Sequence, residues 1–281
     1  MNNAINGDWV DLKKDNGTDI ETLRAHFKGH AYDPHWHDSY LIGVTEQGVQ
    51  QFHCRREKHT STPGRTFFLE PGEIHDGDTR NPKGFTYRQL YLPQNWLKQQ
   101  LKTLFEQCPD NFELSVDSTL SDDRRLAMAV SQAFLTLHTE EVQILRDGAL
   151  DGMLELMTQH LYWRKVSSNK GLNQPVALKT KDYLHAHLRS NIGLQEIAQD
   201  IGCDRFRLNR EFKRSFGLSP HAYLIQLRLV EARHLLRLGY EPADIATDLC
   251  FSDQSHLGRW FKRAYRLTPS DYQKRCTKIP D

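Results

Sequence analysis

The C-terminal third of the 281-residue chain contains a segment that occurs twice, and this repeat restricts the possible folds more than any other feature. Residues 205–220 read RFRLNREFKRSFGLSP, and residues 254–269 read QSHLGRWFKRAYRLTP. In each copy a leucine, a phenylalanine and a second aromatic residue follow one another at intervals of four. This spacing places the three side chains on one face of an amphipathic helix. The repeat therefore predicts two similar basic helices in one domain.

Each predicted basic helix follows a shorter helix and a tight turn. In the first unit, apolar residues at helical spacing fill residues 194–201, Gly202 can adopt the left-handed conformation that ends a helix, and Asp204 can cap the next one. Residues 242–253 repeat this plan, with a serine or an aspartate at 252–253 as the cap. A short helix, a turn and a second helix with exposed basic residues form a helix-turn-helix.

A long helix is predicted between the two units, over residues 220–237. At a rise of 1.5 Å per residue it forms a rod of about 25 Å. Successive major-groove faces of B-DNA lie about 34 Å apart. The rod and the attached units can therefore place two recognition helices in adjacent grooves, so that one polypeptide reads two segments of the duplex.

These residues resemble the AraC/XylS family of bacterial transcription regulators over about a hundred positions. The resemblance implies a double helix-turn-helix that binds DNA, often joined to a cupin-like domain that senses an effector. One departure is Arg266, which stands where many members have glycine after the second recognition helix. The residues that carry the resemblance are Ile197, Ala198, Leu208, Arg210, Phe212, Lys213, Arg214, Gly217, Leu218, Ser219, Pro220, Tyr223, Arg228, Ala232, Ile245, Ala246, residues 250–257, Arg259, Phe261, Lys262, Arg263, Leu267, Thr268, Pro269 and Tyr272.

Roles in DNA binding follow from the resemblance and from helix geometry. Family members contact bases at the positions of Phe206, Asn209 and Arg210, which suit a thymine methyl group, adenine, and guanine or a phosphate. In the second helix Gly258 has no side chain to read a base, and the later lysines and arginines of both helices suit phosphates. The predicted DNA-binding residues are Arg205, Phe206, Asn209, Arg210, Lys213, Arg214, Gln254, Ser255, His256, Arg259, Lys262 and Arg263.

The charge is unevenly distributed along the chain. Residues 176–281 hold 18 basic and 12 acidic residues, a net charge of +6, whereas the rest holds 19 basic and 24 acidic residues, a net charge of −5. A basic C-terminal part suggests a polyanion partner. We expect double-stranded DNA, RNA polymerase and a small-molecule effector as partners, and no membrane.

The first hundred residues predict short strands separated by turns, with strands at residues 40–45, 49–54, 65–69 and 85–92. Two short motifs resemble the cupin pattern of HxH followed by PGxxH. They are the pair His35 and His37, and the PGEIH sequence that ends at His75. The usual cupin metal site also has a glutamate a few residues after HxH, but here the next glutamate is Glu46. The fold class is therefore α+β with two domains: an N-terminal cupin-like β-barrel with following helices, and a C-terminal all-α double helix-turn-helix.

The three histidines permit three interpretations. They can hold a divalent metal, because His35 and His37 are two positions apart and therefore point to the same face of a strand. They can instead be hydrogen-bonded residues that shape the barrel, or they can line a ligand pocket. We favour the pocket, with no metal or other cofactor and no catalytic residues. The alternative function is a metal-dependent cupin enzyme fused to a DNA-binding domain. The predicted effector-binding residues are His35, His37, Tyr40, His75, Tyr87 and Tyr91.

Helical periodicity appears after residue 122. Leu126, Val130, Phe134 and Leu137 form one stripe, and residues 147–163 form a second that ends with Leu161. The two helices can pack against the barrel, or their apolar surface can support a homodimer. We expect a cupin-like sensing domain at residues 1–100, a helical extension at 101–166, a polar linker at 167–176 and the DNA-binding domain at 177–276.

The five cysteines are scattered and form no CxxC pair, which favours a reducing compartment and excludes zinc-finger spacing. The polar N-terminus lacks the apolar core of a signal peptide, and no apolar run approaches the ~20 residues that span a bilayer. These features predict a soluble, cytoplasmic protein.

Overall fold

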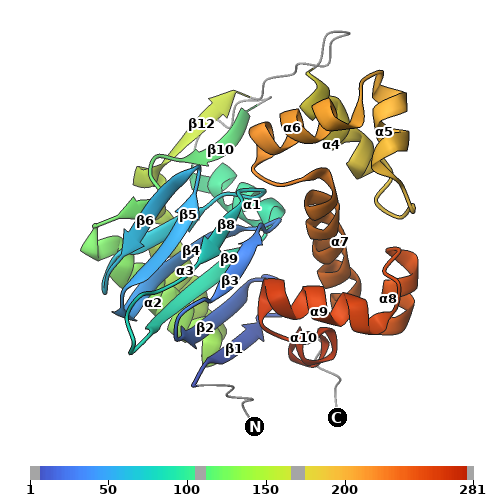
Figure 1. Cartoon of the computed structure of the whole chain (residues 1–281). Coiled ribbons are helices and arrows are strands. Elements are labelled where there is room, and N and C mark those ends of the chain that lie inside the picture. Colours follow the sequence, from blue (N-terminus) through green and yellow to red (C-terminus); the bar gives the residue numbers. More distant parts are fainter. Residues whose placement is uncertain (1–6, 105–111, 166–174, 277–281) are drawn as a thin grey trace. The chain divides into compact units, whose positions relative to one another are not determined.

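The computed structural model describes residues 7–104, 112–165 and 175–276. The chain divides into two compact units, Met1–Val166 and Ser167–Asp281, of which the first is rich in strands and the second helical (Figure 1). This arrangement confirms the predicted fold class.

The first unit is built from antiparallel sheets. A six-stranded sheet has the order β1-β2-β9-β4-β7-β11, a four-stranded sheet has the order β3-β8-β5-β6, and β10 pairs with β12 in a separate ribbon. The strands of this unit are β1 (Trp9–Lys14), β2 (Glu21–Phe27), β3 (Tyr32–His35), β4 (Tyr40–Gly48), β5 (Gln50–Cys54), β6 (Glu57–Ser61), β7 (Thr66–Leu69), β8 (His75–Gly77), β9 (Phe85–Leu92), β10 (Phe112–Val116), β11 (Leu120–Ser121) and β12 (Leu161–Lys165).

Aromatic side chains join the two larger sheets face to face. Phe52 of β5 contacts Phe67 of β7 with ring centroids 6.3 Å apart, and Tyr32 of β3 lies 5.0 Å from Phe27 of β2. Gly43 on β4 allows this close packing, because a Cβ atom there would lie 2.3 Å from the ring of Phe67. The site described below lies between these two sheets.

Helices cover the outer face of the six-stranded sheet. The helices of this unit are α1 (Gln94–Leu104), α2 (Arg124–His138), α3 (Gln143–Met157) and the 3₁₀ turn η1 (Thr158–His160). The predicted stripe of α2 is buried against Ile42, Val44 and Leu90 of the sheet. Most side chains of strands β4 and β9 are therefore buried on both faces of the sheet.

Several elements of the first unit differ from the sequence prediction. The sequence pattern predicts neither β1 nor β2, and it assigns residues 161–163 to the second helix of the middle region. Helix α3 ends at Met157 instead, and Leu161 lies opposite Val116 in the ribbon. In β12, Tyr162 is exposed while Leu161 and Trp163 pack on the core, so strand alternation replaces the helical period there.

The second unit is helical throughout its described residues. It contains α4 (Val176–Ala186), α5 (Leu194–Ile201), α6 (Arg205–Phe216), α7 (Pro220–Arg237), α8 (Pro242–Asp248), α9 (Gln254–Tyr265) and α10 (Pro269–Cys276). Helices α5 and α6 form the first helix-turn-helix, α8 and α9 form the second, and α7 connects them. With 18 residues, α7 is about 27 Å long.

Local sequence signals fix the ends of both recognition helices, α6 and α9. The Asp204 side chain accepts hydrogen bonds from the backbone N–H groups of residues 206 and 207, and Asp253 accepts one from His256. Gly217 ends α6 at φ 77°, while Arg266 ends α9 at φ 58°. The departure at Arg266 is therefore a non-glycine residue held in the left-handed conformation.

Among the described residues, no helix combines the length and the apolar character that crossing a membrane requires.

Candidate functional site

A small cavity lies between the two larger sheets of the first unit. His35 ends β3, His75 begins β8, and the two residues are paired across these strands. The Pro71–Gly72 turn is held beside them because the N–H of Gly72 donates a hydrogen bond to the carbonyl of His37 (2.8 Å). The cavity has a volume of about 30 Å³, and its lining residues are Tyr32, His35, His37, Gln50, Phe52, Phe67, Leu69, His75, Asp76, Tyr87, Gln89 and Tyr91.

The three histidines form one buried cluster. The ring of His35 lies 4.8 Å from that of His37 and 4.5 Å from that of His75, between centroids. One nitrogen of each ring can be chosen so that all three lie within 4.8 Å of one another. Burial lowers the pKa of His75 to about 4, although its hydrogen bond to the backbone of Glu73 acts in the opposite direction. His75 is therefore neutral at neutral pH.

Backbone carbonyls orient two of these rings. Nδ1 of His35 lies 2.8 Å from the carbonyl oxygen of Asp33, and Nδ1 of His75 lies 2.9 Å from that of Glu73. A carbonyl oxygen only accepts hydrogen bonds, so Nδ1 is the donor in both rings. In the neutral tautomer that this requires, Nε2 carries a lone pair.

Tyrosines complete the wall of the cavity. The hydroxyl groups of Tyr32 and Tyr87 lie 2.5 Å apart, and the ring of Tyr91 meets that of His37 edge-on at 5.1 Å. Tyr87, Gln89 and Tyr91 occupy alternate positions of β9 and so share one face. The same alternation, applied to β9 in the sequence, would have identified Gln89.

Five of the six predicted effector-binding residues line this cavity, and Tyr40 does not. Tyr40 lies on the helix-covered face of β4, where its hydroxyl donates a hydrogen bond to the carbonyl of Leu114 (2.8 Å). It lines a separate cavity of about 190 Å³ together with residues of α1 and of the β10–β12 ribbon. Burial is the largest effect that raises the pKa of Tyr40.

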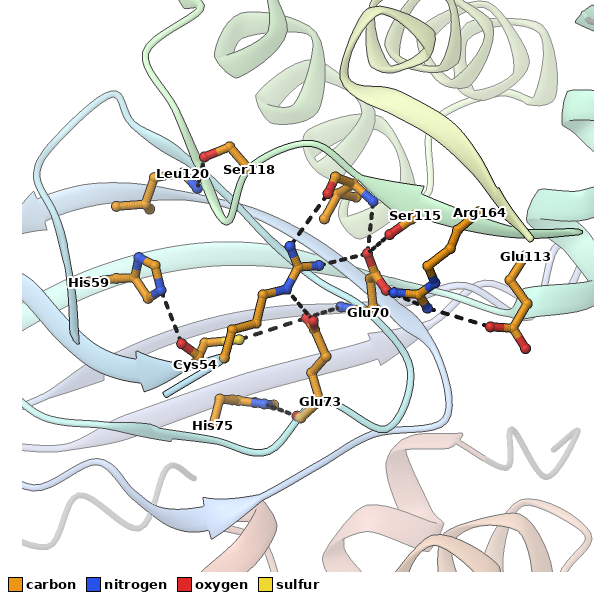
Figure 2. A network of polar contacts seen from close by, with 12 residues as sticks. Cys54, His59, Glu70, Glu73, His75, Glu113, Ser115, Ser118, Leu120 and Arg164 are labelled. Carbon is orange, nitrogen blue, oxygen red and sulfur yellow. Dashed lines mark hydrogen bonds and ion pairs between the residues drawn. The ribbon is translucent and has the colours of Figure 1, made fainter. Parts of the chain in front are cut away.

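An acid–base network begins next to the histidine cluster (Figure 2). Glu70, only 6% exposed, accepts hydrogen bonds at Oε1 from Nη2 of Arg55 (2.6 Å) and from the backbone N–H of Val116 (2.8 Å). Ser115 donates to the same oxygen, and Nε of Arg55 donates to the carboxylate of Glu73. The network thus joins the β5–β6 turn, the end of β7 and strand β10.

Two further residues extend the network in opposite directions (Figure 2). Towards the ribbon, Nη2 of Arg164 on β12 lies 3.5 Å from Oε2 of Glu70. Towards the cavity, the Cys54 thiol donates to Oε2 of Glu73 (3.7 Å), and the carbonyl of Glu73 accepts from His75. Burial raises the pKa of Cys54 to about 12, so the thiol stays protonated and remains a donor.

In the second unit, eleven of the twelve predicted DNA-binding side chains are exposed on α6 and α9. Phe206 is 70% exposed, and the guanidinium of Arg205 lies 4.9 Å from the centroid of its ring. The buried stripes are Leu208 and Phe212 in α6 and Leu257, Phe261 and Tyr265 in α9, which orients the basic faces outward.

The twelfth residue, His256, is half-buried and makes local contacts. Nε1 of Trp260 donates to Nε2 of His256 (2.9 Å), and Nδ1 lies 3.1 Å from the Ser252 hydroxyl. His256 therefore connects the turn before α9 to the helix, and its contact with DNA stays a prediction.

Arg228 of α7 connects the two helix-turn-helix units. It is only 6% exposed, and its guanidinium donates to the carbonyls of Leu188 (3.1 Å), Ser190 (2.8 Å) and Cys250 (3.2 Å). The first two acceptors precede α5, and the third lies in the turn between α8 and α9. Burial lowers the pKa of Arg228, although the group remains charged.

Comparison with protein families agrees with both halves of this description. A family model described as an AraC-like ligand binding domain matches residues 17–154, and one described as a helix-turn-helix domain matches residues 197–275. The chain belongs to the AraC family of transcription regulators. It is a DNA-binding regulator with an N-terminal ligand-binding domain rather than an enzyme, which confirms the predicted function class.

Individual AraC-family relatives are similar over most of their length. An uncharacterized HTH-type transcriptional regulator, YbfI of Bacillus subtilis, is 28% identical over 251 residues, with 88% of each chain covered. The HTH-type transcriptional activator RhaS of Citrobacter koseri is 25% identical over 256 residues, with 87% of this chain and 88% of that protein covered.

Among solved structures, ToxT of Vibrio cholerae has a similar fold. It superimposes with a TM-score of 0.54 over 92% of this chain and 99% of ToxT, at 11% sequence identity. A second ToxT structure, with an unsaturated fatty acid bound, gives a TM-score of 0.53 at 13% identity, with 100% of this chain and 99% of that chain covered.

Proposed function

We propose that this AraC-family regulator reads two neighbouring segments of DNA, one with each recognition helix. Phe206, Asn209 and Arg210 of α6 are exposed together, and so are Gln254, Ser255 and Arg259 of α9. Arginine pairs with guanine, asparagine with adenine, and an apolar ring with the thymine methyl group. This pair of outward-facing, chemically suited side-chain sets is the observation that carries the proposal.

The later residues of both helices suit the DNA backbone. Lys213, Arg214, Lys262 and Arg263 are exposed in the last turns of α6 and α9. Cations at these positions attract phosphates without distinguishing sequences, and they position the protein on the duplex. Arg205 lies at the start of α6, where it can support Phe206.

We propose that ligand binding in the histidine cavity regulates DNA binding. The cavity is lined mostly by buried polar and aromatic side chains, and it lies in the part that matches a ligand-binding domain. The acid–base network gives a physical route from the cavity to strand β12, which ends at Lys165, directly before the predicted linker at residues 167–176. A ligand shifts such an equilibrium only by its differential affinity for the two arrangements.

We propose a homodimer through the helical hairpin α2–α3. The stripes predicted as a dimer seam are used inside the unit, because Leu126, Val130, Phe134 and Leu137 are buried. Other apolar side chains of this hairpin are exposed instead, and they are Met128, Leu135, Val142, Ile144 and Leu145. A second copy of the same surface would cover them, as in two-fold dimers. Ile144→Glu is expected to lower the sedimentation coefficient to that of a monomer.

We further propose that the protein works in the cytoplasm as an activator that contacts RNA polymerase. The support is the name of one relative, RhaS, which is described as a transcriptional activator. Domain boundaries at residues 1–100, 101–166, 167–176 and 177–276 remain our proposal for the functional parts.

Fluorescence anisotropy with a duplex selected from a random library by the wild-type chain tests base reading. Arg259→Ala is expected to cost about 1–3 kcal/mol of binding free energy, the value of a good base contact. Arg207→Ala is the matched control, because Arg207 is an exposed arginine of α6 that is paired with Glu211 (2.8 Å). Binding by Arg259→Ala within twofold of wild type would show that α9 does not read bases.

A further inference from the structure

The geometry points to a divalent transition-metal ion as the ligand of the cavity, bound by His35, His37 and His75. This inference rests on the proposed ligand role of the cavity, but not on DNA binding. All three side chains are buried, with exposed fractions of 2%, 3% and 8%. A search of the described residues for histidine, cysteine, aspartate and glutamate side chains that can converge on one ion finds these three histidines.

The distances suit an ion with little rearrangement. Nitrogens bound to one tetrahedral zinc ion at about 2.0–2.1 Å lie about 3.3 Å from one another. The three candidate nitrogens already lie within 4.8 Å of one another. Small rotations of the imidazole rings are therefore enough to close the site, and the strands that hold His35 and His75 are paired directly.

The hydrogen bonds of the rings prepare them for this role. A metal-bound histidine usually donates its other N–H group to a carbonyl or a carboxylate, which fixes the tautomer and the ring orientation. His35 and His75 donate from Nδ1 to the carbonyls of Asp33 and Glu73. Their Nε2 lone pairs are therefore the metal-binding atoms, and both rings are oriented by the backbone.

The size of the cavity favours an ion over an organic molecule. A volume of about 30 Å³ has room for one or two water molecules. Three imidazole nitrogens suit Zn²⁺, Co²⁺, Ni²⁺, Cu²⁺ or Fe²⁺, whereas Mg²⁺ and Ca²⁺ require oxygen ligands. Asp76 lines the cavity, but its carboxylate is held by the N–H of His53 (2.7 Å) and by its ring (3.0 Å).

Titration of the chelator-stripped, full-length protein with Co²⁺ and with Zn²⁺ alone tests the proposal. We expect one ion per chain and a visible absorption band of cobalt bound by nitrogen. His37→Gln is expected to weaken binding at least tenfold. His234→Gln, which changes an exposed histidine of α7 in the second unit, is expected to leave it unchanged. Absence of binding in the wild type, or equal binding by both variants, would overturn the proposal.

A measurement on the unchanged chain covers the case in which His37→Gln does not fold. X-ray absorption of the zinc-loaded wild-type protein counts imidazole ligands, and we expect three at about 2.0–2.1 Å. Fewer than two imidazoles would contradict the site. DNA binding is measured on the same samples, so that failure of the metal site and failure of the regulator function are seen separately.

Discussion

Nη2 of Arg55 lies 2.6 Å from Oε1 of Glu70, although Arg55 follows the four-stranded sheet's β5 and Glu70 follows β7 of the six-stranded sheet. Glu70 also accepts hydrogen bonds from Ser115 and Val116 of the ribbon. One buried carboxylate thus holds three sheets together. Arg55 has φ 53° and Arg56 φ 67°, so both loop residues of the β5–β6 hairpin occupy the left-handed region, as a two-residue type I′ turn requires.

Glu70→Gln is expected to loosen the ribbon. The neutral amide of glutamine lacks the negative charge that Arg55 pairs with, and its one oxygen is a weaker acceptor for the same donors. The free energy of unfolding should therefore fall by about 1–3 kcal/mol. Hydrogen exchange at residues 112–116 and 161–165 should become faster. Glu113→Gln is the control, because this 59% exposed carboxylate is 3.5 Å from Arg164 at the surface. Equal effects of the two changes would contradict a special role for Glu70.

Glu46→Gln is expected to show a pH-dependent loss of stability. Burial raises the pKa of Glu46, but hydrogen bonds from Arg24 and Arg88 outweigh it and lower the pKa below the usual value. A carboxyl group with a lowered folded-state pKa stabilises the protein above its unfolded pKa, and this stability is lost as the pH falls through the folded pKa.

The difference in unfolding free energy between wild type and Glu46→Gln should therefore be about 1–2 kcal/mol at pH 7, since Arg24 is partly exposed and screened. It should shrink as the pH falls below about 4. Denaturant unfolding at pH 7 and pH 3.5 measures it, and a difference that does not change with pH would be inconsistent with this ion pair.

Arg228→Gln is expected to destabilise the DNA-binding unit by about 2–4 kcal/mol. Three carbonyl groups lose a charged donor, and each such bond contributes about 1 kcal/mol or more. Thermal unfolding should show the loss, and DNA affinity should fall because the two recognition helices are no longer held by a common residue. Arg207→Gln, at the surface of the same unit, should change stability by less than about 0.5 kcal/mol.

The ends of the recognition helices allow a paired test of backbone strain. Arg266→Gly is expected to raise the free energy of unfolding by up to about 1 kcal/mol, because glycine adopts φ 58° without steric cost. Gly217→Ala, at the equivalent position after α6, should lower it by about 1 kcal/mol. Circular dichroism during chemical denaturation gives both values, and a lower stability for Arg266→Gly would show that the arginine side chain outweighs the strain.

Local signals made the second unit predictable from the sequence. Caps such as Asp204 and Asp253, the turn at Gly202 and the buried stripe of Leu208 and Phe212 depend on residues close in the chain. The face of each recognition helix followed from its period, whereas DNA contact by those residues stays a prediction.

The first unit was less predictable because its contacts are long-range. The pairing of Leu114 with Trp163 joins residues far apart in the sequence, and nothing local distinguishes Leu161 in a strand from Leu161 at the end of a helix. Tyr40 faces the helices because it shares one face of β4 with Ile42 and Val44, which pack against them. The local sequence does not specify which face of this strand meets the helices. The three histidines were found because the HxH and PGxxH spacings are local.

The most direct test of DNA reading by both recognition helices is selection of binding sites from a random duplex library. The selection is made with the wild-type chain and with the Asn209→Ala and Arg259→Ala variants. We expect the wild type to select two sequence segments about 10–10.5 base pairs apart. Each variant should lose preference within one segment, a different one for each helix, and keep the other. A single segment, or the same loss in both variants, would contradict the assignment of one reading surface to each recognition helix.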